Sequence, residues 1–477
     1  MSVSGSIKSI HLIAIGGTGV APLACLLRTE GYQVQGSDGP LYPPMSTLLA
    51  EHGITPRLGF EPSHLTPPPD LVIVGNAVPR NNPQAVEAER LGLERMSMPE
   101  ALSHFFLAGR RPLVVAGTHG KTTTSSLAAF VYRSCGQDPG YLIGGMPVDL
   151  PASFERGSSE RFIVEGDEYN AAYFDRGPKF LHYRPETLIL TGVEHDHVDL
   201  YPDAAAFVGA FRDLLEILPP QGLLVADGDS PEVRELTREA PCRVVHYGLG
   251  QNNDVRPSGA IQWQPGGTRC RIVGDGIPSA ELELRLAGDH NLKNALAVWA
   301  VARHDGLPAD QVLAALRSFR GVQRRLEEIG EASGVLIVDD FAHHPTEIGK
   351  TLAALRQQHP SRRLVAAFEP RSLTAGRSFF FDAYLEAFSN ADVVLLAPIY
   401  HFARIDDDER IDLGALAATL RESGVDAHTY DTLDELPEAV APLLEAGDVV
   451  VTMSSGPFAG LPRQLLQALE AREEQAG

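Results

Sequence analysis

The chain has 477 residues, of which 44% are hydrophobic and 21% charged, and its formal net charge is −22. This length predicts two or three domains, and the composition is ordinary for a soluble globular protein. Because so large an excess of negative charge repels phosphate backbones and anionic lipids, nucleic acid and membrane surfaces are excluded as expected partners.

The four cysteines lie far apart and form no CxxC pair, which favours reduced thiols in a cytosolic protein. The N-terminal segment MSVSGSIKSIHLIAIGG carries one lysine and a short apolar run interrupted by glycines. It is too weak for a signal peptide, and no stretch is long enough to span a bilayer. We therefore expect a cytoplasmic protein.

Three blocks follow one another along the chain. In the first, residues 9–38 read as a strand, a glycine turn, a helix and a second strand, and 71–79 read as another buried strand. Further strands are predicted at 111–117, 161–168, 187–197 and 222–229 in the second block, and at 334–341, 362–370, 391–399 and 447–455 in the third. Alternating strands and helices predict an α/β fold with parallel sheets, and residues 256–286 predict short antiparallel strands.

Residues 114–124 read VVAGTHGKTTT, in which an apolar strand runs into a glycine-rich turn. Such a turn exposes backbone N–H groups beside a helix N-terminus, which suits phosphate, while a lysine neutralises the terminal phosphates and a hydroxyl can bind Mg²⁺. Gly117, Gly120, Lys121 and Thr122 therefore predict a triphosphate-binding loop. Val115 stands where the usual spacing has glycine, so the loop is of a shorter type; the alternative is a chance Gly-Lys-Thr turn.

Acidic and imidazole side chains follow two later strands. Glu165, Asp167 and Glu168 end one strand, and the second ends in the run Glu194, His195, Asp196, His197 and Asp199. Carboxyl ends of parallel strands converge on the ligand crevice, where these ligand types suit Mg²⁺ or a second divalent ion. The alternative is that they are solvated loop charges. Zinc is disfavoured because no cysteine lies near.

Polar residues also mark the remaining chain. Asn291 and Asn294 share a helix face and could contact a purine, although ordinary helix capping is the alternative. In the third block, candidate residues lie at the ends of the strands predicted at 334–341 and 362–370, and two arginines lie before the first of these strands. Each by itself could be a solvated loop residue. They are Arg324, Arg325, Asp339, Asp340, His343, His344, Glu369 and Arg371.

The motifs GTHGKTTT, EGDEY, EHDH, HNLKNALA, QRRLE and DDFAHHPTE occur in this order, and with them the chain resembles the Mur ligases of peptidoglycan synthesis over nearly its whole length. The form DDFAHHP and the lack of an obvious lysine near 205–220 resemble the branch that acts on UDP-N-acetylmuramate. Finer similarities are YPPMSTLL, DLVIVGNAVPRNNP, KFLHYRPETLIL, EPRS and MSSGPFAGLPRQLL.

The resemblance implies an ATP-dependent amide ligase of the acid–amino acid type, with ATP and Mg²⁺. It implies a Rossmann-like UDP-sugar domain at 1–109, a central P-loop domain with a small antiparallel sheet at 110–322, and a Rossmann-like acceptor domain at 323–477. The lactyl carboxylate of UDP-N-acetylmuramate would react through an acyl phosphate. The finer motifs imply L-alanyl-γ-D-glutamyl-meso-diaminopimelate as the acceptor, in peptidoglycan recycling; the alternative is L-alanine in de novo synthesis.

The resemblance also implies roles for single residues. ATP would contact Gly117, Thr118, His119, Gly120, Lys121, Thr122, Thr123, Asn291, Asn294, Arg325 and Asp340; the metal ligands would be Thr122, Glu168 and His197, with Glu165 the competing carboxylate. The substrates would contact Gly17, Thr18, Gly19, Ser37, Asp38, His343 and Arg371. Lys121, Arg325 and His343 would be catalytic. The oligomeric expectation is a monomer or weak homodimer.

A dinucleotide-dependent oxidoreductase is the rival from another class. Gly17 and Gly19 follow a strand, and Asp38 lies about 20 residues further on, as in a dinucleotide-binding fold. The third glycine of GxGxxG is missing, however, and no Tyr-Lys or Cys-His catalytic set accompanies the motif. A regulatory P-loop ATPase without ligase activity is a further alternative.

Overall fold

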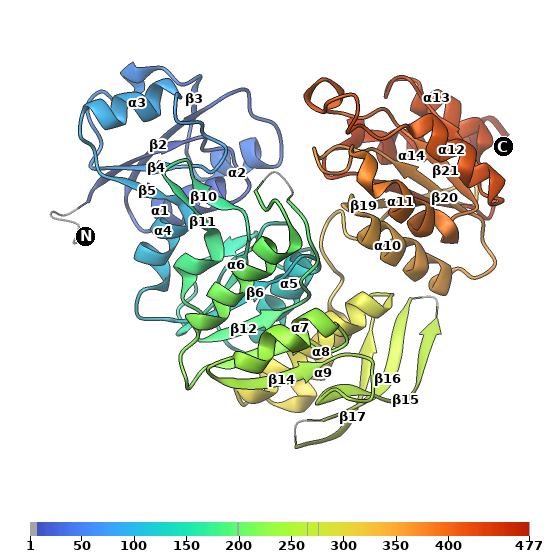
Figure 1. Ribbon diagram of the computed structural model, residues 1–477, viewed down its shortest axis with the longest axis horizontal. Helices are drawn as coiled ribbons and strands as arrows, with labels where there is room; N and C mark the ends of the chain where they lie inside the picture. The colour runs from blue at the N-terminus through green and yellow to red at the C-terminus, as the bar shows by residue number, and fades with distance from the viewer. Residues whose placement is uncertain (1–6, 198–199, 265, 275, 477) are drawn as a thin grey trace. The chain divides into compact units, whose positions relative to one another are not determined.

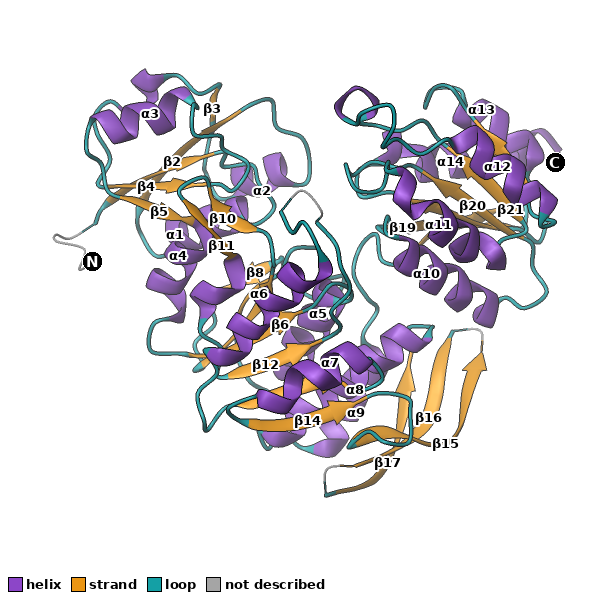
Figure 2. Cartoon of the chain, in the orientation of Figure 1, coloured by secondary structure: helices purple, strands orange, loops and turns teal. Residues whose placement is uncertain are grey.

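The computed structural model describes residues 7–197, 200–264, 266–274 and 276–476 of the chain (Figure 1). They form two compact units. The first comprises Met1–Arg256, Gly274–Ile277 and Ala295–Ala315, and the second comprises Pro257–Val273, Pro278–Asn294 and Leu316–Gly477. Helices alternate with strands along most of both units, as Figure 2 shows.

The first unit begins with a five-stranded parallel sheet in the order β3-β2-β1-β4-β5. Its strands are β1 (Ser9–Ile13), β2 (Gln33–Asp38), β3 (Arg57–Leu58), β4 (Leu71–Val74) and β5 (Arg95–Ser97). Helices α1 (Val20–Thr29), α2 (Met45–Glu51) and α4 (Met98–Leu102) pack on one face, and α3 (Pro83–Arg90) packs on the other. Both faces of the sheet are therefore buried, as is usual for parallel sheets.

A second sheet of the same unit contains β6, with β9 on one side and β12 on the other, all parallel. Its strands are β6 (Arg111–Ala116), β7 (Gly140–Leu142), β8 (Phe154–Glu155), β9 (Arg161–Gly166), β12 (Thr187–Leu190), β13 (Leu223–Asp227) and β14 (Arg243–Tyr247), in the order β14-β13-β12-β6-β9-β7-β8. The helices are α5 (Lys121–Ser134), α6 (Ala204–Glu216) and α7 (Pro231–Leu236). The residues that follow β6, β9 and β12 consequently share one edge of the sheet.

A hairpin of β10 (Asn170–Ala172) and β11 (Asp175–Pro178) connects the two sheets of the first unit. The hydroxyl of Ser97 donates to Asp175 at 3.0 Å, and the guanidinium of Arg95 donates to the Tyr173 hydroxyl at 2.9 Å. These bonds join the end of β5 to the hairpin.

Three consecutive strands, β15 (Val255–Gln264), β16 (Gly267–Gly274) and β17 (Ile277–Leu284), lie side by side. Because only a few residues connect them, they are antiparallel, as parallel neighbours require long crossovers. Helices α8 (Asp289–His304) and α9 (Ala309–Ser318) follow. The predicted antiparallel segment at 256–286 is thereby confirmed.

The second unit ends in a six-stranded sheet in the order β18-β19-β23-β20-β21-β22, in which β18 is antiparallel to β19 and the other pairs are parallel. The strands are β18 (Glu327–Ala332), β19 (Val335–Asp340), β20 (Leu364–Phe368), β21 (Val393–Leu396), β22 (Asp426–Thr429) and β23 (Val449–Met453). Helices α10 (Pro345–Gln358), α11 (Phe381–Ala387) and α12 (Leu413–Glu422) cover one face, and α13 (Leu436–Val440) and α14 (Leu461–Ala476) cover the other.

The predicted α/β fold with parallel sheets is confirmed. Each predicted strand contains an observed one, whereas β3, β5, β7, β8, β10, β11, β14, β18 and β22 were not predicted. Among the described residues, no helix is both long and apolar enough to cross a membrane.

Candidate active site

The glycine-rich turn at residues 117–120 connects β6 to α5. Gly117 has a φ of 130° and Gly120, the N-cap of α5, has a φ of 80°, both in the region that favours glycine. A Cβ atom on Gly117 would also lie 2.4 Å from Oγ1 of Thr191. Glycine therefore allows a backbone path that brings the free amides at the start of α5 to the turn, where they can bind an anion.

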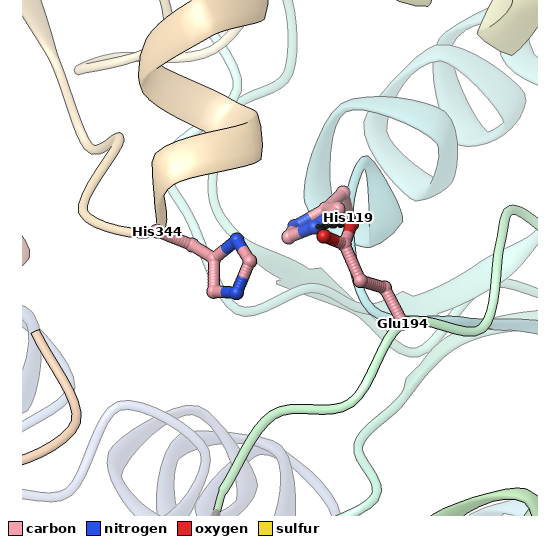
Figure 3. Close-up of side chains that lie close together, drawn as sticks. All are labelled: His119, Glu194 and His344. Carbon is pink, nitrogen blue, oxygen red and sulfur yellow. Dashed lines mark hydrogen bonds and ion pairs between the residues drawn. The ribbon is translucent and has the colours of Figure 1, made fainter. Parts of the chain in front are cut away.

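Hydrogen bonds fix this turn to the segment that follows β12. The Thr118 hydroxyl donates to the backbone oxygen of Glu194 at 2.9 Å and accepts from its N–H at 2.8 Å. The Thr191 hydroxyl donates to the His119 carbonyl at 2.5 Å. In Figure 3 the imidazole of His119 lies beside the Glu194 carboxylate, with Nε2 and Oε2 2.9 Å apart. The turn is therefore held rigidly before any ligand binds.

Lys121 opens α5, and its ammonium group is surrounded by oxygen atoms. Nζ donates to the carbonyl of Gly117 at 2.6 Å and to the two carboxylate oxygens of Glu168 at 3.1 and 2.9 Å. Burial would lower the pKa of Lys121, but the charges of Glu168, Asp167 and Glu165 outweigh burial and raise it. The lysine is thus a fixed positive charge in the turn.

Glu165 and Thr122 meet beside this lysine. The Thr122 hydroxyl donates to Oε1 of Glu165 at 3.0 Å, while Oε2 accepts from the backbone N–H of Gly144 at 2.9 Å. A carboxylate and a hydroxyl on neighbouring elements, the end of β9 and the start of α5, form a pair of oxygen donors suited to a hard cation.

Three potential metal ligands converge next to Lys121: Asp167, Glu168 and His197 each offer one atom within 4.8 Å of the others. The Glu168 side chain is 1% exposed, and its Oε1 lies 3.4 Å from Nε2 of His197. Burial would raise the pKa of Asp167, but Lys179 and Lys121 lower it to about 2. Asp199, singled out in the sequence, lies outside the described residues.

These donors fit the groups that the sequence predicts. Carboxylate and hydroxyl oxygens with one imidazole are the ligands that Mg²⁺ or a similar divalent ion accepts. The ammonium group of Lys121 donates to the Glu168 carboxylate, which shows that this position stabilises a negative charge. Together with the amides of α5, the site suits a triphosphate with its metal ion.

In the N-terminal sheet, the turn after β1 contains Gly17, Thr18 and Gly19, and Thr18 is exposed. Asp38, at the end of β2, accepts a hydrogen bond from the N–H of Gly16 at 2.7 Å. The carboxylate therefore ties the end of β2 to the glycine-rich turn.

Ser37 is fully buried, and its hydroxyl donates to the side-chain oxygen of Gln84. Nε2 of His11 lies 3.2 Å from the same hydroxyl, and burial lowers the pKa of His11 to about 4. The Ser37 side chain thus belongs to an internal polar network. Sequence reasoning missed Gln84 and His11; the one signal for His11 was a polar residue inside the otherwise apolar run of β1.

In the second unit, Asp340 ends β19 and holds the segment before β18. Its carboxylate accepts from the N–H groups of Leu326 at 2.7 Å and Ala342 at 2.8 Å. Burial raises the pKa of Asp340 to about 6, against the opposing charge of Arg325. Asp340 therefore fixes the backbone that carries Arg325.

Arg325 and His343 share one acidic partner. Nη1 of Arg325 lies 3.7 Å from Oε1 of Glu347, and Nδ1 of His343 lies 3.4 Å from Oε2 of the same carboxylate. The guanidinium of Arg325 also lies 5.0 Å from the centre of the Phe341 ring. Three predicted residues, Arg325, Asp340 and His343, are thus gathered at the end of β19.

Arg371, which follows β20, packs its guanidinium 3.8 Å from the ring centre of Tyr400. Its Nη1 donates to Oε1 of Glu369 at 3.3 Å, and Glu369 is completely buried. No pattern in the sequence predicted Tyr400 as a partner, because the contact joins two loops 29 positions apart (400 − 371).

Asn291 and Asn294 lie in the first turns of α8 and are both buried. Nδ2 of Asn291 donates to the carbonyl of Ala287 at 2.8 Å, and Nδ2 of Asn294 donates to Oδ1 of Asn291 at 3.4 Å. The two amides therefore form one internal pair on the same helix face.

Three family signatures match the chain in succession. The Mur ligase family catalytic domain matches residues 9–110, the Mur ligase middle domain matches 115–302, and the glutamate ligase domain of Mur ligases matches 324–456. The middle-domain match includes nearly all of the turn and acidic cluster described above.

Among similar proteins, the UDP-N-acetylmuramate–L-alanyl-γ-D-glutamyl-meso-2,6-diaminoheptandioate ligase of Escherichia coli (strain K12) is 38% identical over 98% of this chain and 99% of its own. The UDP-N-acetylmuramate–L-alanine ligase of Variovorax paradoxus (strain S110) is 34% identical over 98% of this chain and 96% of its own.

Solved structures of similar ligases match the chain over nearly its whole length. A murein peptide ligase of Psychrobacter arcticus 273-4 is 31% identical over 97% of this chain and 99% of its own, with a TM-score of 0.73. The UDP-N-acetylmuramate–alanine ligase of Thermotoga maritima, at 22% identity over 99% of this chain and all of its own, shares the fold with a TM-score of 0.80. The successive signatures and the full-length relatives show that this chain belongs to the Mur ligase family.

Proposed function

We propose that the protein is an ATP-dependent ligase that joins the lactyl carboxylate of UDP-N-acetylmuramate to the amine of L-alanyl-γ-D-glutamyl-meso-2,6-diaminoheptanedioate. The carrying observation is the oxygen-lined ammonium of Lys121 at the start of α5, beside the carboxylates of Glu165 and Glu168. The acceptor is supported by the Escherichia coli relative, 38% identical over its whole length, whose name contains this peptide.

The proposed reaction must overcome the repulsion between two anions. A carboxylate must be activated before an amine can attack it, and here the activating group is the terminal phosphate of ATP, also an anion. Two unit charges of like sign about 4 Å apart repel by roughly 4 kcal/mol at an effective dielectric constant near 20. The ammonium of Lys121 and the amides of α5 offset this repulsion and position the phosphate.

The proposed reaction has two steps. A carboxylate oxygen attacks the terminal phosphorus and ADP leaves, which gives an acyl phosphate; the acceptor nitrogen then attacks the acyl carbon, phosphate leaves and the nitrogen loses a proton. We assign Lys121 to the phosphate in the first step. Arg325 and His343, which share Glu347, are assigned to the acyl phosphate.

Thr122, Glu168 and His197 would hold Mg²⁺, which when bound supplies positive charge to the phosphates. Gly117, Thr118, His119, Gly120 and Thr123 belong to the same turn and helix start, and we assign them to the nucleotide with Asn291, Asn294 and Asp340. Gly17, Thr18, Gly19, Ser37 and Asp38 are assigned to the UDP-sugar, and Arg371 to an acceptor carboxylate. The exposed position of Thr18 supports its assignment to the UDP-sugar. Ser37 would contribute through its backbone, because its hydroxyl already donates to Gln84 inside the domain.

The domain boundaries that we propose are 1–109, 110–322 and 323–477. The matched segments 9–110, 115–302 and 324–456 support them.

A panel of acceptors tests the function. With Mg-ATP and UDP-N-acetylmuramate, we expect phosphate release with the tripeptide at a kcat/KM at least about 100-fold above that with L-alanine, because a site built for several carboxylates gains about 1.5–3 kcal/mol for each charged hydrogen bond. Release measured without UDP-N-acetylmuramate is the control. Preference for L-alanine would instead support the alternative activity of the Variovorax paradoxus relative.

The metal ligand can be tested with two matched variants. We expect Glu168→Gln to raise the Mg²⁺ concentration for half-maximal turnover by about 10-fold or more, and Glu165→Gln to raise it less, because Glu168 lies in the three-ligand cluster with Asp167 and His197. Magnesium titrations of phosphate release measure both. A larger shift for Glu165→Gln would assign the metal to the carboxylate that binds Thr122.

A further inference from the structure

The segments that follow β20 and β21 each contain two arginines, and the second also contains the acidic run Asp406–Glu409. The two strands are parallel neighbours, so the segments that follow them begin at the same edge of the sheet. Arg371 follows β20, and Arg404 lies in the loop that follows β21. This edge is where an α/β sheet presents its ligand-binding loops, and both arginines therefore lie on elements placed for binding.

The two loops are joined into one body. The N–H of Ser378 donates to the carbonyl of Glu409 at 2.7 Å, and the N–H of Ile411 donates to the carbonyl of Gly376 at 3.0 Å. A Cβ atom on Gly376 would lie only 2.6 Å from Cδ1 of Ile405, so the loops pack closely. The positions of Arg371 and Arg404 are consequently coupled.

The first arginine of this edge is already oriented. Arg371 is held between the buried carboxylate of Glu369 and the ring of Tyr400, which is 51% exposed. Because the stacked ring reaches solvent, the guanidinium lies at the surface of the edge rather than in the core. An arginine held in one orientation loses less entropy when it binds a carboxylate.

Other arginines of the loops are committed to internal contacts. Arg377 pairs with Glu409. Arg410 pairs with Asp407 at 2.8 Å and lies 3.6 Å from the ring centre of Phe402. These contacts stabilise the loop from within and leave those guanidinium groups less available to a ligand.

Arg404 differs from them. Its side chain is exposed, and within the part of the chain that the structure describes it makes no ion pair. Burial lowers the pKa of His401, and the positive charges of Arg404 and Arg371 lower it further. The geometry links the two arginines through this histidine: the N–H of Arg404 donates to the His401 carbonyl at 2.8 Å, and the His401 ring lies 4.9 Å from the Tyr400 ring on which Arg371 stacks.

The acceptor named for the relatives matches two such charges. In L-alanyl-γ-D-glutamyl-meso-2,6-diaminoheptanedioate, the γ-linkage leaves the α-carboxylate of the glutamyl residue free, and the diaminoheptanedioate has two more. L-Alanine has a single carboxylate. A second cation thus distinguishes the peptide from the amino acid.

We propose that Arg404 binds a carboxylate of the acceptor peptide beyond the one held by Arg371, and so selects the peptide over L-alanine. This inference rests on the proposed function. It makes Arg404 a specificity residue: it contributes to peptide binding and takes no part in the transfer of the phosphate or the attack of the amine.

The test combines one variant with altered acceptors. Arg404→Gln is expected to raise KM for the tripeptide by about 10- to 100-fold with kcat within threefold of wild type, which corresponds to the loss of one charged hydrogen bond. Three tripeptides, each with one carboxylate changed to a carboxamide, are assayed beside it. One of the carboxamides should raise the wild-type KM by a similar factor. The same carboxamide should raise the KM of Arg404→Gln less than threefold, because the arginine that binds this carboxylate is already absent.

Arg212→Gln is the matched control: it removes another exposed arginine, from α6, and should leave KM for the tripeptide unchanged. The unfolding midpoint of Arg404→Gln should equal that of wild type. If the wild type uses the tripeptide but Arg404→Gln changes its KM less than threefold, or still shows the full penalty with every carboxamide, the role of Arg404 is overturned alone. If the wild type prefers L-alanine, the proposed acceptor is overturned as well.

Discussion

Replacing Lys121 with alanine is expected to lower kcat for the tripeptide by about 10³-fold or more at saturating ATP. The reason is electrostatic: the buried ammonium places a positive charge beside the turn between β6 and α5, where we propose that the attacking carboxylate and the terminal phosphate meet. Phosphate release under single-turnover conditions measures the effect. Lys121→Arg keeps the charge but not the compact shape, and should lose less activity than alanine.

The structure adds a second consequence of this change. Without Lys121, the Glu168 carboxylate, 1% exposed, loses the ammonium at 2.9 Å, and removing one partner of a buried ion pair costs about 3–5 kcal/mol of unfolding free energy. The double variant Lys121→Met with Glu168→Gln removes both charges and should recover most of that stability. Activity should remain low in the double variant. Recovery of turnover would show that Lys121→Ala lost activity because it unfolds, and would contradict the role of Lys121.

The fold was predictable where burial dictates sequence pattern. β6 and β23 are mostly apolar, because parallel strands covered on both faces admit little else, and both were predicted. β18 reads EEIGEA and β22 reads DAHT, patterns that indicate loops. They become strands because each pairs with an apolar neighbour, β19 or β21, at an edge of the sheet.

The candidate site was predictable as a set of residues but not as a set of contacts. The sequence indicated that the ends of β6, β9 and β12 share one edge, which brings Lys121 near several acidic side chains. It could not indicate that Glu168, rather than Glu165, pairs with the ammonium group of Lys121, because that pairing depends on side-chain packing between residues 47 positions apart. Likewise Ser37 was expected to face a substrate, and only its packing against Gln84 reveals an internal hydroxyl.

A second large effect is expected at the other edge of the sheet that contains β6, away from the glycine-rich turn at residues 117–120. The Asp305 carboxylate accepts from the guanidinium of Arg161, at the start of β9, and from the Tyr132 hydroxyl at 2.5 Å. The side chains of Arg161 and Asp305 are only 6% and 9% exposed. Asp305→Ala would leave a buried guanidinium without this partner, so we expect unfolding free energy to fall by about 3–5 kcal/mol.

Denaturant unfolding with two companion variants tests this expectation. Tyr132→Phe removes one neutral donor and keeps the ion pair, so it should cost about 1 kcal/mol, while Asp310→Ala removes an exposed acid from the first turn of α9 and should cost less than about 1 kcal/mol. Because Arg161 begins β9 whereas the acidic cluster follows its other end, Asp305→Ala should keep the wild-type KM for ATP below its unfolding temperature. A loss no larger than that of Asp310→Ala would mean that Arg111, whose Nη2 lies 4.0 Å from Asp305, and the solvent already share the charge, and that the buried pair contributes little to stability.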